Sequence, residues 1–121
     1  MKRIGIINEP IARKENSIIE RCVSPLGQNA ITHFKVLKEF QYYSLIECNL
    51  ETGRTHQIRV HMSHLGHPLL GDSLYNMNSD VDELINRQAL HSYKMEFIHP
   101  VSKNKLLLEA DIPEDIKKLI I

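Results

Sequence analysis

The most informative stretch of the chain reads Glu51-Thr-Gly-Arg-Thr-His-Gln-Ile-Arg-Val-His61. Within eleven residues it places two arginines, two histidines and a glutamine around one turn-forming glycine. Few purely structural segments need so many hydrogen-bonding side chains at once. The composition of this stretch therefore indicates a functional site as well as a fold element.

The residues that follow Gly53 have the pattern of a short helix. Thr55 is the expected N-cap, since its hydroxyl can accept a hydrogen bond from a free backbone amide, and Gly66 is the expected C-cap. A helix over residues 55–65 would place Arg59 beside the core, with a buried stripe on one face. The stripe consists of Ile58, Met62 and Leu65.

The rest of the chain reads mainly as strands, because β-branched and aromatic residues cluster between turn-forming residues. Strands are expected over residues 31–40, 42–50, 89–98 and 105–111, and short helices over residues 81–87 and 114–121. Successive strands are close enough to pair as antiparallel neighbours. We expect one domain over residues 1–121, of the α+β class, with a mixed, largely antiparallel sheet and a few short helices.

Composition describes a globular protein of ordinary size. The chain has 121 residues, of which 42% are hydrophobic and 25% are charged, and this balance excludes a disordered chain. Cys22 and Cys48 have no metal-type spacing, so reduced thiols are expected. The apolar run at residues 4–7 is too short for a signal peptide or a membrane span. A cytoplasmic protein is expected.

Charge is distributed unevenly although the formal net charge is zero. Residues 1–60 contain nine Lys or Arg and six acids, whereas residues 61–121 contain six and nine. The basic excess thus lies in the half with the central motif, which weakly favours contact with phosphate groups.

The central motif and its flanks resemble the RluA-type family of RNA pseudouridine synthases. The resemblance is carried by LETGRTHQIRVHMSHLGHPLLGDSLY at residues 50–75, and by segments on both sides of it. These are GIINEPIARKENSIIERCVSPLGQNAITHFKVL at residues 5–37 and ALHSYKMEFIHPVSKNKLLLEADIPED at residues 89–115. Nearly the whole chain is covered, and the motif is far more specific than a short glycine pattern.

The resemblance implies an isomerase that converts uridine in structured RNA, ribosomal or transfer RNA, to pseudouridine without any cofactor. In this family the nucleophilic aspartate lies in an upstream HRLD-type segment, followed by a tyrosine that packs on the target base. Neither has a counterpart in this sequence. The 121 residues are therefore expected to be the C-terminal part of a catalytic domain that is inactive alone.

Arg59 carries the strongest expectation from the resemblance, which pairs the matching arginine with the catalytic aspartate. A partly buried guanidinium needs an anionic partner, because it cannot lose its proton. The alternative is a scaffold salt bridge from Arg59 to Glu47 or Glu51. Ile58 resembles the apolar wall of the uracil pocket, and ordinary core packing would suit it equally.

RNA contacts are expected from the polar residues around Arg59, because a flipped nucleotide needs phosphate and base-edge anchors. The candidates are Arg54, Thr55, His56, Gln57 and His61. For each one taken singly, a solvated or locally hydrogen-bonded side chain is about as good an interpretation.

Two other interpretations of the motif are weaker. Four histidines raise a metal hypothesis, but no pair at i, i+4 with a glutamate accompanies them and no metal site is expected; they are His56, His61, His64 and His67. Asp72, in GDSLY, is better read as a turn residue whose carboxylate bonds nearby amides than as the missing nucleophile. Tyr75 is read as a packing residue.

Two classes of function stay open beside the metal hypothesis. The chain is either a piece of an RNA pseudouridine synthase or a non-catalytic RNA-binding or orphan domain. The expected partners are RNA and either the N-terminal half of the catalytic domain or a second copy of the chain, since an unpartnered half would expose a sheet edge and apolar surface.

Overall fold

The computed structural model describes residues 3–75, 85–98 and 105–120. Contacts divide the chain into two compact units, residues 1–88 and residues 89–121. All strand pairs among these described residues are antiparallel. With two helices in the described part of the chain, the fold is α+β as predicted. The single domain over residues 1–121 stays a prediction.

The first unit is built on a three-stranded sheet in the order β1-β4-β5. Its strands are β1 (Ile4–Asn8), β4 (Ile31–Glu39) and β5 (Ser44–Leu50). β4 and β5 lie where the sequence predicts strands, joined by a tight turn in which the Phe40 amide donates to the Tyr43 carbonyl over 2.8 Å. β1 was not expected, because Ile4–Asn8 is short and becomes a strand only by pairing with β4.

A small hairpin continues from β1. Its strands are β2 (Ile11–Arg13) and β3 (Arg21–Val23), and the segment at residues 24–28 folds back against β2. Gly27 makes this return possible, because a Cβ there would lie 2.4 Å from the Ile11 carbonyl carbon. Neither hairpin strand was predicted, since three residues are too few to show a period.

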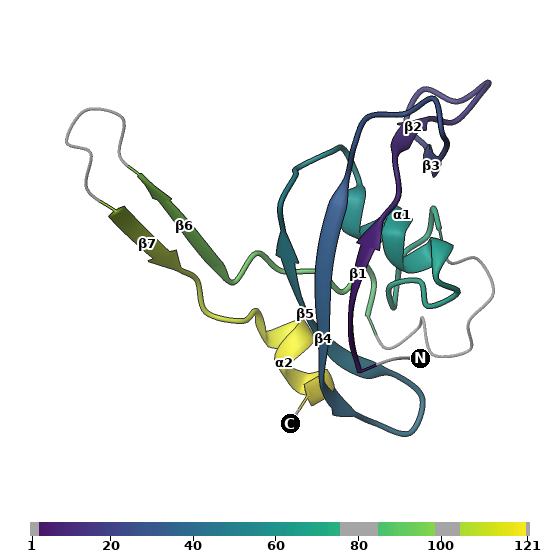
Figure 1. Cartoon of the computed structure of the whole chain (residues 1–121). Coiled ribbons are helices and arrows are strands. Elements are labelled where there is room, and N and C mark those ends of the chain that lie inside the picture. The colour runs from purple at the N-terminus through teal and green to yellow at the C-terminus, as the bar shows by residue number, and fades with distance from the viewer. Residues whose placement is uncertain (1–2, 76–84, 99–104, 121) are drawn as a thin grey trace. The chain divides into compact units, whose positions relative to one another are not determined.

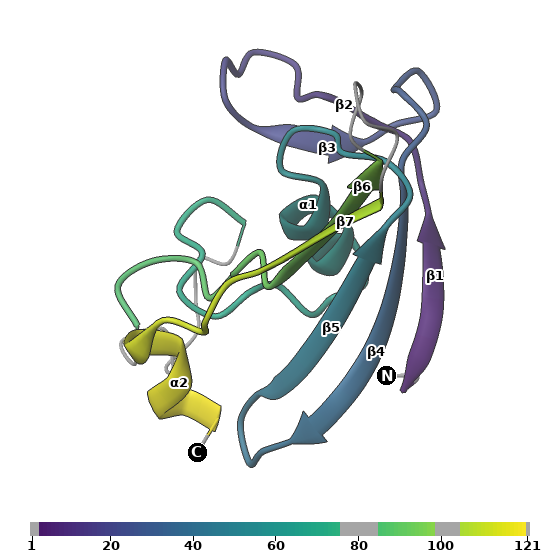
Figure 2. The same ribbon diagram turned by 90° about the vertical axis from the view of Figure 1, so that its left-hand side faces the viewer.

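Helix α1 (Gln57–His64) lies against one face of the β1-β4-β5 sheet (Figures 1 and 2). Met62 joins Ile7 and Phe34 in one buried cluster, with Ile46 and Cys48 of β5 packed against it. Val60 joins Ile11 and Ala30 in a second cluster. The helix is therefore held from two sides.

Both ends of α1 differ from or refine the prediction. Thr55 is exposed and is not the N-cap; the N-cap is His56, in the left-handed region with φ 57°. At the other end, Gly66 has φ +85°, and the amides of Gly66 and His67 donate to the carbonyls of Ser63 and Met62. This is the Schellman arrangement that a glycine favours.

The second unit contains a hairpin and a helix. Its elements are β6 (Lys94–Ile98), β7 (Lys105–Glu109) and α2 (Glu114–Ile120). All three lie within predicted segments, although the predicted strands over residues 89–98 and 105–111 are longer than the observed ones. The predicted helix over residues 81–87 falls largely outside the described residues.

Candidate active site

The N-terminal half of α1 positions the residues of the central motif on two sides. One side faces the sheet and carries Gln57 and His61, and the other carries Arg59 toward the turn at residues 69–75. The buried stripe differs from the predicted one, because Leu65 is exposed and Gln57, Val60, His61 and Met62 are the buried helix residues.

Gln57 is a scaffold residue. Its side chain is buried, and its amide nitrogen donates to the Thr32 hydroxyl over 2.9 Å and to the Ile31 carbonyl over 3.0 Å. Its amide oxygen accepts from the Thr52 hydroxyl and the Arg54 backbone amide. No polar atom of Gln57 is left for RNA, so the predicted contact is corrected to a structural role.

His61 completes the same buried network. It is fully buried, with Nδ1 2.8 Å from the Thr32 hydroxyl and Nε2 2.9 Å from the Glu9 carbonyl. A carbonyl only accepts, so we infer that Nε2 carries the proton and Nδ1 accepts from Thr32. Burial is the main cause that lowers the pKa of His61. The predicted RNA contact is corrected here as well.

Arg59 pairs with Asp72. Its Nε donates to Asp72 Oδ2 over 2.9 Å, and a terminal nitrogen donates to Oδ1 over 2.8 Å, which is the strong two-pronged geometry. The Arg59 side chain is 14% exposed and that of Asp72 is fully buried. The alternative of a scaffold salt bridge is therefore the pairing that the structure shows, although the acid is Asp72 and not Glu47 or Glu51.

Asp72 is held ionised by its surroundings. Burial by itself would raise the pKa of Asp72, but the hydrogen bonds from Arg59, Tyr75 and Leu74 outweigh it and lower the pKa. The Leu74 and Tyr75 amides both donate to Oδ1. Asp72 is thus the turn residue that the sequence predicts, and it is also the anchor for Arg59.

Tyr75 ties three parts of the site together. Its hydroxyl accepts from the Arg21 amide over 2.9 Å and lies 2.8 Å from His56 Nδ1, and its ring faces the Arg59 guanidinium at 5.1 Å. Burial is the main cause that lowers the pKa of His56, which favours the neutral ring. The left-handed His56 backbone brings the ring to Tyr75.

Sequence reasoning missed the Arg59–Asp72 pair and underrated Tyr75. The available signal was GDSLY, in which an acid and a tyrosine lie three residues apart and a carboxylate at a turn can bond both following amides. Thirteen residues separate Arg59 from Asp72, so no helical or strand spacing links them.

Ile58 is half-buried and packs against the cluster of Ile7, Phe34 and Met62. Ordinary packing therefore accounts for its position, and the uracil-wall role stays a prediction. Among the described residues, no three His, Cys, Asp or Glu side chains lie close enough together to hold a metal ion. None of the described helices is long and apolar enough to cross a membrane.

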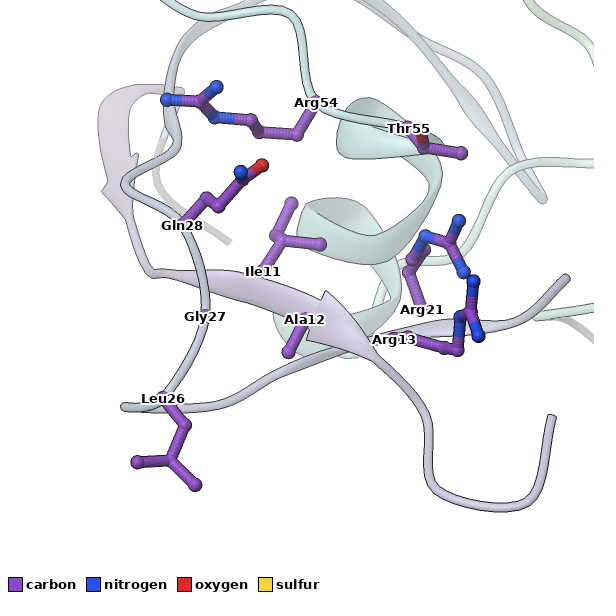
Figure 3. Close-up of a pocket in the computed structure, with 9 residues that line it drawn as sticks. All are labelled: Ile11, Ala12, Arg13, Arg21, Leu26, Gly27, Gln28, Arg54 and Thr55. Atoms are coloured by element: carbon purple, nitrogen blue, oxygen red, sulfur yellow. The ribbon is translucent and has the colours of Figure 1, made fainter. Parts of the chain in front are cut away.

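Arg54 and Thr55 line a surface hollow of about 380 Å³ beside the start of α1 (Figure 3). Arg54 Nε donates to the Asn29 carbonyl over 2.7 Å. Two arginines that the motif does not contain, Arg13 and Arg21, line the same hollow. Of the predicted RNA contacts, Arg54 and Thr55 thus lie at an accessible site, and His56 lies at the inner site with Tyr75.

Comparisons with known proteins point to one family. Residues 1–64 match the family model described as RNA pseudouridylate synthase. The uncharacterized RNA pseudouridine synthase YhcT of Bacillus subtilis is 51% identical over 117 residues, covering 95% of this chain and 38% of that protein. Ribosomal large subunit pseudouridine synthase D of Vibrio cholerae is 40% identical over 126 residues, covering 95% and 39%.

A solved structure has a similar fold. The human RNA pseudouridylate synthase domain containing 1 superposes with a TM-score of 0.77 at 26% identity, over 91% of this chain and 49% of that chain. The chain thus spans well under half the length of the curated relatives it matches. By these matches, the chain belongs to the RluA-type family of RNA pseudouridine synthases.

Proposed function

We propose that these 121 residues form the part of an RNA pseudouridine synthase that presents Arg59 to a catalytic aspartate supplied by another segment. In the reaction, the bond between uracil N1 and the ribose breaks and a bond from C5 to the ribose forms. A proton leaves C5 and one is gained at N1, so the reaction needs no oxidant, reductant or energy source. The target is uridine in structured RNA.

The observation that carries the proposal is the way Asp72 holds Arg59. A guanidinium has five N–H donors in a fixed plane, and Asp72 engages two of them. Within the described residues, no hydrogen bond uses the other terminal nitrogen. An Arg59 fixed at one edge by Asp72 can therefore receive a second carboxylate at its free edge.

Asp72 would then act as a positioning residue. Its hydrogen bonds raise the pKa of Arg59 while partial burial opposes them, and its pairing selects one rotamer of a long side chain. A positioned cation favours ionisation of an incoming aspartate. Ile58 would contribute to the uracil wall, while Arg54, Thr55 and His56 would contact RNA.

The experiment is a chimera in which this chain replaces the matching 38% of the 51%-identical Bacillus subtilis protein. Tritium release from RNA labelled at uracil C5 measures turnover. We expect release by the chimera and by the parent, and none by the 121 residues alone. In the chimera, Arg59→Gln should lower kcat at least 100-fold, whereas the exposed Arg3→Gln should leave it unchanged.

Turnover by the 121 residues alone would refute the role given to Arg59. An inactive chimera of a well-folded, active parent would favour the second candidate, a non-catalytic RNA-binding domain.

The name of the Vibrio cholerae relative favours ribosomal RNA as the target class. Separate assays on ribosomal and transfer RNA transcripts test this choice. We also propose a cytoplasmic protein, because ribosomal and transfer RNA are abundant in the cytoplasm.

A protein partner is supported by the edge strand β1. It has the sheet's last position, and Ile4 and Ile6 are 67% and 62% exposed. An exposed apolar edge favours pairing with another strand. We propose that the N-terminal part of the catalytic domain, or a second copy, covers it. Sedimentation of the 121 residues tests the second copy: self-association that Ile6→Lys reduces would support it, and a concentration-independent monomer would exclude it and leave the N-terminal part.

A further inference from the structure

Two arginines face each other directly across the β2–β3 hairpin. Arg13 and Arg21 are register partners in this antiparallel pair, so their side chains project from the same face. Both line the hollow beside α1, and their guanidinium groups lie next to each other in Figure 3. Like charges directly opposite on neighbouring strands repel and destabilise the pair.

No acid neutralises this pair among the residues that the structure describes. The ion pair on the same hairpin joins Lys14 to Glu20 over 3.3 Å and leaves both arginines out. Arg21 makes one long hydrogen bond, from a terminal nitrogen to the Ile18 carbonyl at 3.4 Å, which removes no charge. Within the described part of the chain, these two adjacent cations thus have no acidic partner.

A third cation completes the hollow. Arg54 lies on the opposite side from Arg13 and Arg21 (Figure 3), and its Nε is held by the Asn29 carbonyl. The floor between them is uncharged and includes Ile11, Gly27 and Gln28. A volume of about 380 Å³ lies within the range of ligand sites, roughly 300–1,000 Å³.

We propose that this hollow binds two successive phosphate groups of an RNA strand, one on the Arg13–Arg21 pair and one on Arg54. Guanidinium groups match phosphate geometry by paired hydrogen bonds. A phosphate between Arg13 and Arg21 would also remove their mutual repulsion. The proposal rests on the proposed function, because it takes the strand to be the one that carries the target uridine.

The hollow is connected to the Arg59 site through Arg21. While the Arg21 side chain lines the hollow, its backbone amide donates to the Tyr75 hydroxyl, and the Tyr75 ring faces Arg59. An RNA strand bound to the Arg21 side chain would therefore lie close to Tyr75 and His56, because the Arg21 backbone contacts Tyr75. Phosphate contacts fix the register of a strand without reading its sequence.

The test measures binding of fluorescent 12-nucleotide oligo(U) and oligo(A) RNA to the 121 residues by anisotropy at several salt concentrations. Arg13→Gln and Arg21→Gln should each weaken binding roughly fivefold and reduce the salt slope by about 0.7. Both oligonucleotides should lose affinity equally. Arg3→Gln is the matched control, since it removes the same charge from an exposed ion pair with Glu39.

An unchanged affinity in both hollow variants, or an equal loss in Arg3→Gln, would overturn the proposal. Folding of each variant is checked by far-UV circular dichroism. A loss for oligo(U) alone would also overturn it, because the site would then read bases. Turnover by the chimera is measured separately from binding. If the chimera is active and the Arg13 and Arg21 variants bind RNA normally, phosphate binding in the hollow is refuted and the proposed function stands.

Discussion

Arg59 and the Arg13–Arg21 pair are cationic centres near helix α1 that differ in where their anion comes from. Arg59 is 14% exposed and is paired by a fully buried carboxylate of the same chain. Arg13 and Arg21 lie at a hollow and have no acid partner in the described part of the chain. Asp72 thus holds the Arg59 side chain in place before any ligand binds, which suits a residue that positions another group. The charges of Arg13 and Arg21 are not neutralised by an acid in the described residues, which suits a site that binds an anion.

The largest effect is expected at the Arg59–Asp72 pair. Asp72→Ala leaves the Arg59 charge without its partner and frees the Leu74 and Tyr75 amides, so it should lower the free energy of unfolding by about 3 kcal/mol. Asp72→Asn keeps an acceptor oxygen for the amides and should cost less. Urea unfolding followed by circular dichroism measures both.

Glu39→Ala is the control for Asp72→Ala, since Glu39 pairs with Arg3 at a site where both side chains are 61% exposed. Its loss should stay below about 0.5 kcal/mol. If the two variants are equally stable, Asp72 does not hold the Arg59 side chain in place.

The second largest effect concerns Gly27, in the floor of the hollow that Arg13 and Arg21 line. In Gly27→Ala, the new Cβ would lie 2.4 Å from backbone carbon and 2.5 Å from backbone oxygen of Ile11. Backbone cannot move aside as a side chain does, so the free energy of unfolding should fall by about 2 kcal/mol. RNA affinity should fall with it.

Gly53→Ala is the matched control, because a Cβ there meets nothing within 4 Å. It should be neutral or stabilising by about 0.5 kcal/mol. A Gly27→Ala variant as stable as Gly53→Ala would mean that the hollow's floor is not closely packed.

The third effect is a pH dependence of stability that comes from His61, on the buried side of α1. The folded-state pKa of His61 is lowered, mainly by burial, so the unfolded chain binds more protons once pH falls below about 6.5. Stability should be full above that pH and should decrease as pH falls toward the folded pKa, by at most about 1.4 kcal/mol per pH unit for this one group.

His61→Gln should be less stable at pH 7 and should show a smaller decrease between pH 7 and pH 5. His56 contributes a dependence of the same sign, since its pKa is lowered too. The variant His67→Gln, at an exposed position, is the control. Equal pH profiles for His61→Gln and the natural sequence would remove His61 as the cause.

The smallest effect has the opposite sign. Arg13→Gln removes the like-charge contact with Arg21, so it should raise the free energy of unfolding by about 0.5 kcal/mol at low salt. The gain should vanish in 0.5 M salt, where charges are screened. A loss of stability at low salt would show that Arg13 is held by an unrecognised contact and is not available for phosphate.

Much of the fold follows from local patterns. Strands β4 and β5, the turn between them and helix α2 were predicted, because each is long enough to show a period or has a strong capping residue. Strands β1, β2 and β3 were missed, since short segments become strands only when partners pair with them. The exposed position of Leu65 shows the same limit, because a helical period does not say which face is buried.

The candidate site divides in the same way. That Asp72 forms a turn was readable from the motif, and the catalytic role of Arg59 stays a prediction. The burial of Gln57 and His61 was not, because a buried polar side chain is stable only where hydrogen-bond partners surround it. The distant partners are Thr32 and the Glu9 carbonyl, which lie at least 25 residues away along the chain.

By itself, the sequence determined the family and the antiparallel α+β class, because these follow from short-range pattern and from a motif of high specificity. Only the tertiary structure decided which arginine is already paired and which is open to a ligand. The reason is that charge neutralisation acts over a few ångströms in space, and the fold alone brings Asp72 to Arg59 and sets Arg13 against Arg21.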